Sequence, residues 1–152
     1  MLARRVFLKS GLAVVTGWVL AGLLKPLRAF AAEWPKMAFE SRKIEDTLRN
    51  LFGTSQTSPS ASIKITAPFE AENGAFVRCA VSVDLPDVTT VAVLVERNPI
   101  ALVTAMNFNG AKAYLTLGMK MAQTSDVYAI AKSHGKLYSA KQNIQVLVSG
   151  CA

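Results

Sequence analysis

Cys151, Cys79 and His134 are the residues of this chain best suited to covalent or acid–base chemistry. A cysteine reacts as its thiolate, which solvent stabilises and apolar surroundings disfavour. Cys151 is the penultimate residue and follows a glycine, so we expect its sulfur to be exposed on a pliant chain end. An exposed thiol without a role risks oxidation, and this position therefore indicates a thiol that is used.

Three other interpretations of Cys151 come from its neighbours. The run Val148-Ser149-Gly150-Cys151 resembles a lipoprotein box, but such a box directly follows a signal sequence. A prenylation motif needs three residues after its cysteine, and only Ala152 follows here. A disulfide, to another chain or to Cys79, stays open beside the functional thiol, because the residues alone do not decide between them.

For Cys79 and His134 the sequence favours structural roles. Cys79 lies in phase with the apolar residues of a predicted strand, so its side chain is expected to face the core, where a thiol is inert. His134 lies between Ser133 and Gly135 in a predicted hairpin tip, with no Cys, Asp or Glu close in sequence to complete a site. No CxxC, HExxH, GxGxxG or Walker motif occurs, and we expect no cofactor and no metal.

Residues 1–31 have the pattern of an export signal. The twin-arginine motif is made by Arg4, Arg5, Phe7, Leu8 and Lys9. The apolar run 11–24 is short for a bilayer span, and the Ala-Phe-Ala of residues 29–31 predicts cleavage after Ala31. A Sec signal or an uncleaved anchor is the alternative, but Lys25 and Arg28 after the apolar run disfavour the Sec route. We expect a periplasmic protein without a stable membrane anchor after cleavage, exported folded and bound to a partner.

The formal net charge of +7 suggests nucleic-acid binding, but the positions of the charges argue against it. Five of the 17 basic residues and none of the 10 acidic ones lie in residues 1–31, so the remainder carries 12 basic and 10 acidic groups, a net charge of +2. A phosphate-binding surface needs clustered cations, and these are scattered among acids. The remainder is therefore expected to bind no nucleic acid. With 51% hydrophobic residues in the chain, it is expected to form a single packed domain.

The sequence after the predicted cleavage at Ala31, here called the mature part, predicts one helix followed by an all-β domain. Ile44, Leu48, Leu51 and Phe52 fall on one helical face, and Gly53 suits the C-terminal end of that helix. Ser41 is the expected N-cap. From residue 62 the hydrophobic period becomes two, and residues 88–95 are nearly all apolar, as in a central strand covered on both faces. About seven short strands separated by turns are typical of an antiparallel β-sandwich. The predicted turns are Glu72-Asn73-Gly74, Leu85-Pro86-Asp87, Asn98-Pro99, Asn109-Gly110 and residues 133–136.

Several short segments, taken in their order, give the mature chain a family resemblance. They are the helix at 39–52, residues 63–68 followed by 71–74, Asn98-Pro99-Ile100 leading to Phe108, residues 121–124 with 127–129, residues 135–140, and the terminal Gly150-Cys151. With the twin-arginine signal before them, these segments in this order resemble the sequences of SoxY, the family of sulfur-carrier subunits in bacterial thiosulfate oxidation.

The resemblance implies an organisation in four parts. These are a signal peptide (1–31), a helix and linker (32–60), an immunoglobulin-like β-sandwich (61–148) and a carrier arm (149–152). It implies that Cys151 holds the sulfur covalently on a flexible arm completed by Ser149, Gly150 and Ala152. The arm of the family ends Gly-Gly-Cys-Gly-Gly, so the arm here is shorter and stiffer.

The resemblance also implies partners. A SoxZ-like subunit would pair with this chain and be exported with it. A Sox cytochrome would couple thiosulfate oxidatively to the thiol, a hydrolase would release sulfate and leave a persulfide, and a sulfane dehydrogenase would act on the remaining sulfur. The chain would then be a carrier and not itself an enzyme. The alternatives are a periplasmic thiol-redox protein, which would need a resolving cysteine or a base beside Cys151, and a structural sandwich module that uses the terminal cysteine for a disulfide.

Overall fold

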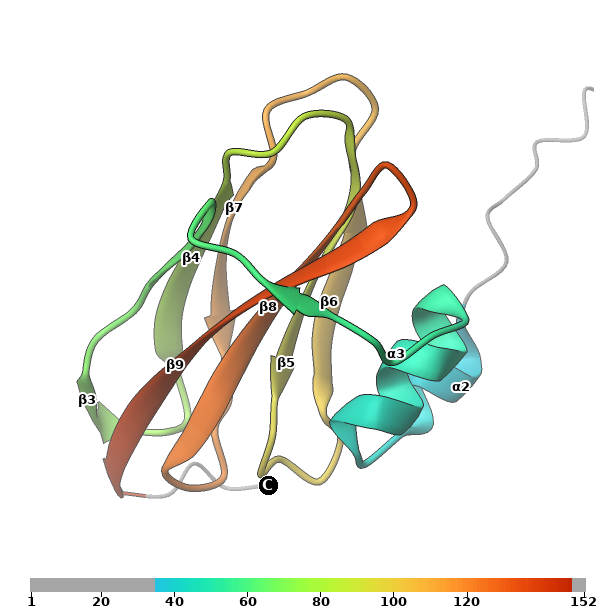
Figure 1. Cartoon of the computed structure of the whole chain (residues 1–152). Coiled ribbons are helices and arrows are strands. Elements are labelled where there is room, and N and C mark those ends of the chain that lie inside the picture. Colours follow the sequence, from blue (N-terminus) through green and yellow to red (C-terminus); the bar gives the residue numbers. More distant parts are fainter. Residues whose placement is uncertain (1–34, 149–152) are drawn as a thin grey trace, which may run out of the picture. The chain divides into compact units, whose positions relative to one another are not determined.

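The computed structural model describes residues 35–148, which form a β-sandwich with two short helices (Figure 1). The twin-arginine motif and residues 149–152, with Cys151, lie outside the described residues. No helix in the described part of the chain is long and apolar enough to cross a membrane. The elements are α2 (Lys36–Glu40), α3 (Ile44–Phe52), β1 (Ser58–Pro59), β2 (Ile63–Thr66), β3 (Glu70–Asn73), β4 (Val77–Val83), β5 (Val88–Val95), β6 (Leu102–Asn107), β7 (Tyr114–Met119), β8 (Ser125–Ser133) and β9 (Lys136–Val148).

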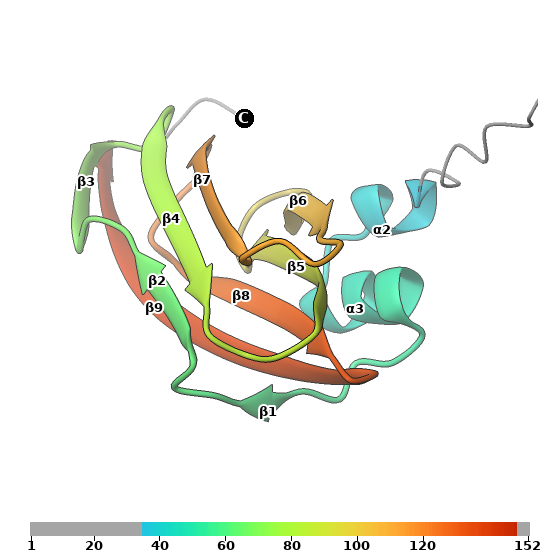
Figure 2. The same cartoon turned by 90° about the horizontal axis from the view of Figure 1, so that it is seen from above.

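The strands form two sheets that pack face to face (Figure 2). The large sheet has the order β1-β9-β8-β5-β6, with β3 also paired to β9, and the small sheet has the order β2-β4-β7. Neighbouring strands are antiparallel, except that β1 and β3 run parallel to β9. The all-β sandwich predicted from the sequence is confirmed.

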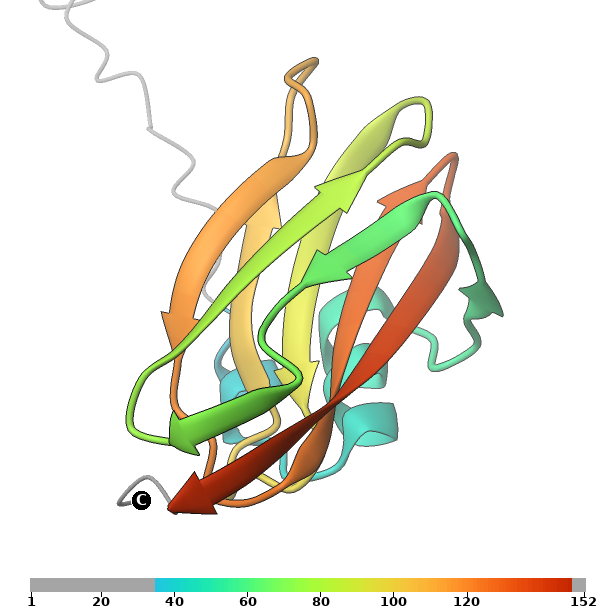
Figure 3. The ribbon, with the colours of Figure 1, turned by 90° about the vertical axis from the view of Figure 1, so that its left-hand side faces the viewer.

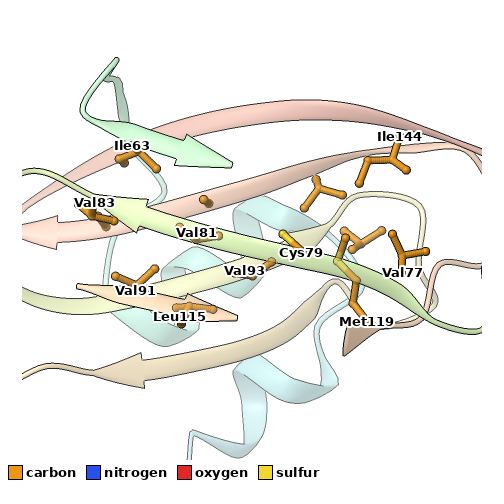
Figure 4. Close-up of a cluster of buried hydrophobic side chains, with 14 of the residues drawn as sticks. Ile63, Val77, Cys79, Val81, Val83, Val91, Val93, Leu115, Met119 and Ile144 are labelled. Atoms are coloured by element: carbon orange, nitrogen blue, oxygen red, sulfur yellow. The ribbon is translucent and has the colours of Figure 1, made fainter. Parts of the chain in front are cut away.

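The core between the sheets follows from the alternation of apolar residues. In β4, Val77, Cys79, Val81 and Val83 are buried, whereas the residues between them are half-buried or exposed. This row faces apolar side chains of β5, β7 and β9, as Figure 4 shows around Cys79. Burial of this many branched side chains is the main source of stability that the sequence supplies to the sandwich.

The helices cover the outer face of the large sheet. Ala38 of α2 and Leu48 of α3 pack with Leu94, Ile130 and Leu137 of β5, β8 and β9. As a result β5 is buried on both faces, with Val91, Val93 and Val95 toward the other sheet, which explains why its sequence is almost entirely apolar.

Local predictions succeed where one residue's backbone preference decides the outcome. Gly53 ends α3 with a left-handed φ of 81°, which a glycine adopts without strain. His134 and Gly135 form the two-residue turn between β8 and β9, and both have a positive φ, as the tight turn requires.

Three local predictions differ from the structure. Ser41 is not the N-cap of α3, because the chain breaks between two helices and Ser41 follows α2, where its hydroxyl donates to the Met37 carbonyl at 2.7 Å. The turn expected at Glu72-Asn73-Gly74 starts at Gly74, because β3 pairs with β9 up to Asn73. The sequence pattern predicts two separate strands, at residues 137–139 and 144–148, but the structure has one strand, β9, of 13 residues.

Candidate functional site

The Cys79 thiol lies in the core. Its residue is 3% exposed, and the surrounding Val93 and Met119 are fully or almost fully buried (Figure 4). Burial raises the pKa of the Cys79 thiol from 9.0 to about 11, because the apolar surroundings disfavour the thiolate. The structural role predicted for Cys79 is therefore confirmed, and at neutral pH this sulfur is a poor nucleophile.

His134 meets an acid that its sequence neighbours did not reveal. Its Nε2 lies 3.5 Å from Oδ2 of Asp87, and the two side chains are 59% and 77% exposed. The β4–β5 connection and the β8–β9 turn are also joined by the Ser133 hydroxyl, which donates to the Pro86 carbonyl at 2.6 Å. Asp87, like His134, has a positive φ. Within residues 35–148 no group of three or more His, Cys, Asp or Glu side chains could hold a metal. The pair is an exposed contact between two turns.

The end of β9, which leads into residues 149–152, is held by backbone hydrogen bonds. The Gly74 amide donates to the Val148 carbonyl, and the Met121 amide donates to the Gly74 carbonyl, each at 2.8 Å. The Val146 amide donates to the Thr124 hydroxyl at 2.9 Å. The last described residue before the predicted arm is therefore attached to the β3–β4 turn, as the dark red end of β9 in Figure 3 indicates.

Large apolar side chains are exposed around this end of β9. Leu147 and Val148 are 62% and 61% exposed, and Phe69 and Phe76 are exposed to a similar degree. Phe69 lies beside β9, since its carbonyl accepts the Gln145 amide at 2.9 Å. Phe76 follows the β3–β4 turn that holds Val148. These side chains leave exposed apolar surface around the end of β9.

A groove of about 560 Å³ opens on the outer face of the small sheet, close to the β3–β4 turn. Arg78 of β4 lies directly across from Gly118 of β7, and the Phe76 ring lies over Gly118, where an added Cβ would collide with it. The other residues that line the groove come from the end of β2, from the two residues that follow it, and from the middle of β4 and β7. They are Thr66, Ala67, Pro68, Cys79, Ala80, Thr116 and Leu117.

Sequence reasoning missed this groove. Arg78 reads as one of many scattered cations, and its position opposite Gly118 depends on the register of two strands far apart in sequence. One signal was available, because a glycine inside a strand often marks the close approach of another group. Asn98 was also taken only as a turn residue, but its side-chain amide donates to the Lys120 carbonyl and accepts from the Ala122 amide, at 2.8 and 2.9 Å. It thereby orders the β7–β8 connection beside the end of β9.

Comparison with known proteins gives this arrangement a context. The family model described as sulfur oxidation protein SoxY matches residues 48–151. The solved structure of the sulfur carrier protein SoxY from Chlorobium limicola f thiosulfatophilum is 32% identical, covers 74% of this chain and 99% of its own, and superposes with a TM-score of 0.65. The reeler domain of human F-spondin is 11% identical over 59% of this chain and 93% of its own, with a TM-score of 0.39, too low to carry an argument. None of the curated proteins compared with the chain matches it.

The fold and these matches define a sulfur carrier of bacterial sulfur oxidation, built on an all-β sandwich. Within that class, the chain belongs to the SoxY family, as its resemblance predicted. The family match runs through Cys151, the residue predicted to carry the sulfur. Cys151, Ser149, Gly150, Ala152 and the export-signal residues lie outside the described residues, so their roles stay predictions.

Proposed function

We propose that this chain is a periplasmic carrier that holds thiosulfate-derived sulfur covalently on the Cys151 thiol during thiosulfate oxidation. The observation that carries the proposal is the contrast between the two cysteines. Cys79 is buried with a raised pKa, which leaves Cys151 as the thiol for a role that the family requires of a cysteine. The match to the family extends to this residue.

The chemistry needs one thiol on this chain and three reactions by partner proteins. In loading, the Cys151 thiolate bonds to the outer sulfur of thiosulfate and gives Cys–S–S–SO₃⁻, while two electrons pass to the Sox cytochrome. In hydrolysis, water attacks the sulfonate sulfur, the S–S bond to the sulfonate breaks, and the products are sulfate, two protons and the Cys151 persulfide anion, Cys–S–S⁻. A sulfane dehydrogenase then oxidises the persulfide sulfur.

Peptide mapping by mass spectrometry after thiosulfate turnover tests the carrier role. We expect the sulfur adduct on the Cys151 peptide, complete loss of thiosulfate-dependent activity in Cys151→Ser, and retained loading in Cys79→Ala. The two variants form a matched pair, because each removes one of the only two thiols in the chain. An adduct on the Cys79 peptide, or full activity in Cys151→Ser, would contradict the proposal.

The periplasmic location is proposed from the twin-arginine motif. Replacing Arg4 and Arg5 by lysine keeps the charge but removes the pair that defines the signal, so unprocessed precursor should accumulate in the cytoplasm. Cell fractionation measures this directly. Normal processing of the double variant through the Sec route would refute the assignment.

A SoxZ-like subunit is the proposed stable partner. In the described structure the outer edges of β6 and β7 have no neighbouring strand, and the exposed side chains of Ile100, Met106 and Tyr114 lie on or beside them. Unpaired strand edges with apolar side chains favour association with another chain. Sedimentation of the processed protein mixed with a co-encoded SoxZ-like chain should give a heterodimer. Two separate monomers in the mixture would contradict the pairing.

A further inference from the structure

The last four residues of β9 extend beyond the strand that supports the rest of it. The pairing of β8 with β9 ends where Ser125 lies opposite Ile144, and residues 145–148 continue past this point. There they pair with β3, which is a strand of only four residues. The residues from which the proposed arm starts therefore depend on contacts outside the main ladder of the large sheet.

The β7–β8 connection supplies such contacts. The Thr124 hydroxyl accepts the Val146 amide at 2.9 Å. The Met121 amide donates to the Gly74 carbonyl, and the Gly74 amide donates to the Val148 carbonyl, each at 2.8 Å. Met121 and Gly74 are buried, and a buried amide that loses its acceptor is left unsatisfied, so these two bonds are costly to open. The connection thus holds the end of β9 at Val146 directly and at Val148 through Gly74.

Asn98 fixes this connection from the turn between β5 and β6. Its half-buried side-chain amide donates to the Lys120 carbonyl at 2.8 Å and accepts the Ala122 amide at 2.9 Å. It therefore holds the residues on both sides of Met121. An asparagine side chain carries both a donor and an acceptor and makes the two bonds at once, whereas an alanine makes neither of them.

We propose that Asn98 is a positioning residue for the carrier reaction, because it fixes the connection that holds Val148, the residue from which the predicted arm starts. The inference rests on the proposed function, in which Cys151 is the loaded residue. Asn98 acts at a distance from the sulfur. It limits the length of chain between Cys151 and the fixed backbone of the sandwich.

The expected size of the effect follows from the length of that tether. Cys151 is three residues from Val148, where β9 is held, and seven residues from Ile144, the last residue paired with β8. The effective concentration of a tethered group falls roughly as the −3/2 power of the tether length. If residues 145–148 are released, the concentration of Cys151 in the active site of a docked partner enzyme should therefore fall about three- to fourfold.

Loading kinetics test this consequence. The processed protein and its Asn98→Ala variant, each paired with the SoxZ-like subunit, are loaded from thiosulfate by the partner cytochrome of the proposed function, and intact mass follows the adduct. With the carrier as the varied substrate, kcat should be about three- to fourfold lower in Asn98→Ala, and KM should not change, since the docked surface stays the same. The small reagent methyl methanethiosulfonate needs no docking, so its rate of reaction with Cys151 should be equal in both proteins.

Amide hydrogen exchange, measured by NMR, separates this local role from a general loss of stability. In Asn98→Ala the exchange of the Gly74 and Val146 amides should accelerate by a larger factor than that of the Val93 amide in the covered strand β5. The matched control is Asn109→Ala. Asn109 is an exposed turn residue beyond the other end of β6, so its replacement should leave the exchange of these amides and the loading kinetics unchanged.

A second variant keeps the proposal falsifiable if Asn98→Ala folds poorly. Thr124→Val nearly keeps the shape of the side chain and removes the hydroxyl that accepts the Val146 amide, so kcat should fall by a smaller factor. An unchanged kcat in every variant that folds would overturn the positioning role, and so would equal acceleration of exchange at Val146 and Val93. Either result would leave the carrier role standing, because that role fails only if thiosulfate turnover does not load Cys151.

Discussion

The large sheet is covered on both faces, whereas the small sheet is covered on one. Leu94, Ile130 and Leu137 lie beneath the two helices on the outer face of the large sheet. At the corresponding outer positions of the small sheet the chain has Lys64, Arg78, Thr116 and other short or polar side chains. The first sheet is thus a scaffold whose side chains determine stability, and the second leaves a face free for binding.

The largest effect is expected where the large sheet meets the helices. Leu94→Ala should lower the free energy of unfolding by about 2–5 kcal/mol, because Leu94 is fully buried and the helices cannot close the cavity without moving. Urea denaturation monitored by circular dichroism measures this loss. A change below about 1 kcal/mol would mean that the helices are not a firm cover for this sheet.

A pH-dependent effect should arise from Cys79, on the inner face of the small sheet. The pKa of this thiol is about 11 in the folded protein and 9.0 without burial, so the folded state keeps its proton over a range in which the unfolded state loses it. Stability is therefore fully present below pH 9 and falls as the pH rises toward 11, by about 1–2 kcal/mol. The free energies of unfolding of the original sequence and of Cys79→Ala are measured by denaturation at several pH values, and the difference between the two proteins isolates this effect. A difference that does not change with pH would contradict the burial of the thiol.

At neutral pH, Cys79→Ala should lower the free energy of unfolding by on the order of 1 kcal/mol, because it leaves only a small cavity in the core. Thermal unfolding of the two proteins at the same pH gives this value. A loss of several kcal/mol would indicate that Cys79 makes a specific interaction beyond packing, such as its weak contact with the Ala80 carbonyl at 3.9 Å.

The smallest effects are expected on the outer face of the small sheet. Thr116→Ala and Lys64→Gln should each change the free energy of unfolding by less than about 0.5 kcal/mol, because both side chains are exposed. Chemical denaturation of each variant tests this. A large loss at either position would show that this face also stabilises the fold, and the contrast between the sheets would no longer hold.

Much of this contrast between the large and the small sheet could be predicted from the sequence. The alternating residues of β4 and the nearly continuous apolar run of β5 predict one sheet face exposed and one strand covered on both sides, because a side chain's burial follows its polarity. Gly53, and the turn at His134 and Gly135, were predictable for another reason, since few residues adopt a positive φ without strain.

The rest depends on contacts between distant residues. Ser41 has the right chemistry for an N-cap, but the break between α2 and α3 gives that position to Lys43. The approach of His134 to Asp87, and of Phe76 to Gly118, follows from strand register, which periodicity does not give. The predicted site residue, Cys151, was found only by its place at the chain end and by resemblance to a family.

Strand β9 has a mechanical consequence for the proposed carrier role, in which partner proteins bind the chain end. It pairs with β8 along residues 136–144 and with β3 from Gln145 to Val148, so it is hydrogen-bonded almost to the last described residue. A partner that pulls on the chain end loads these bonds together, in shear along the strand, and does not peel them apart one at a time. In the proposed carrier role, β9 therefore stays paired when a partner enzyme holds the chain end, and the sandwich does not unfold from that end.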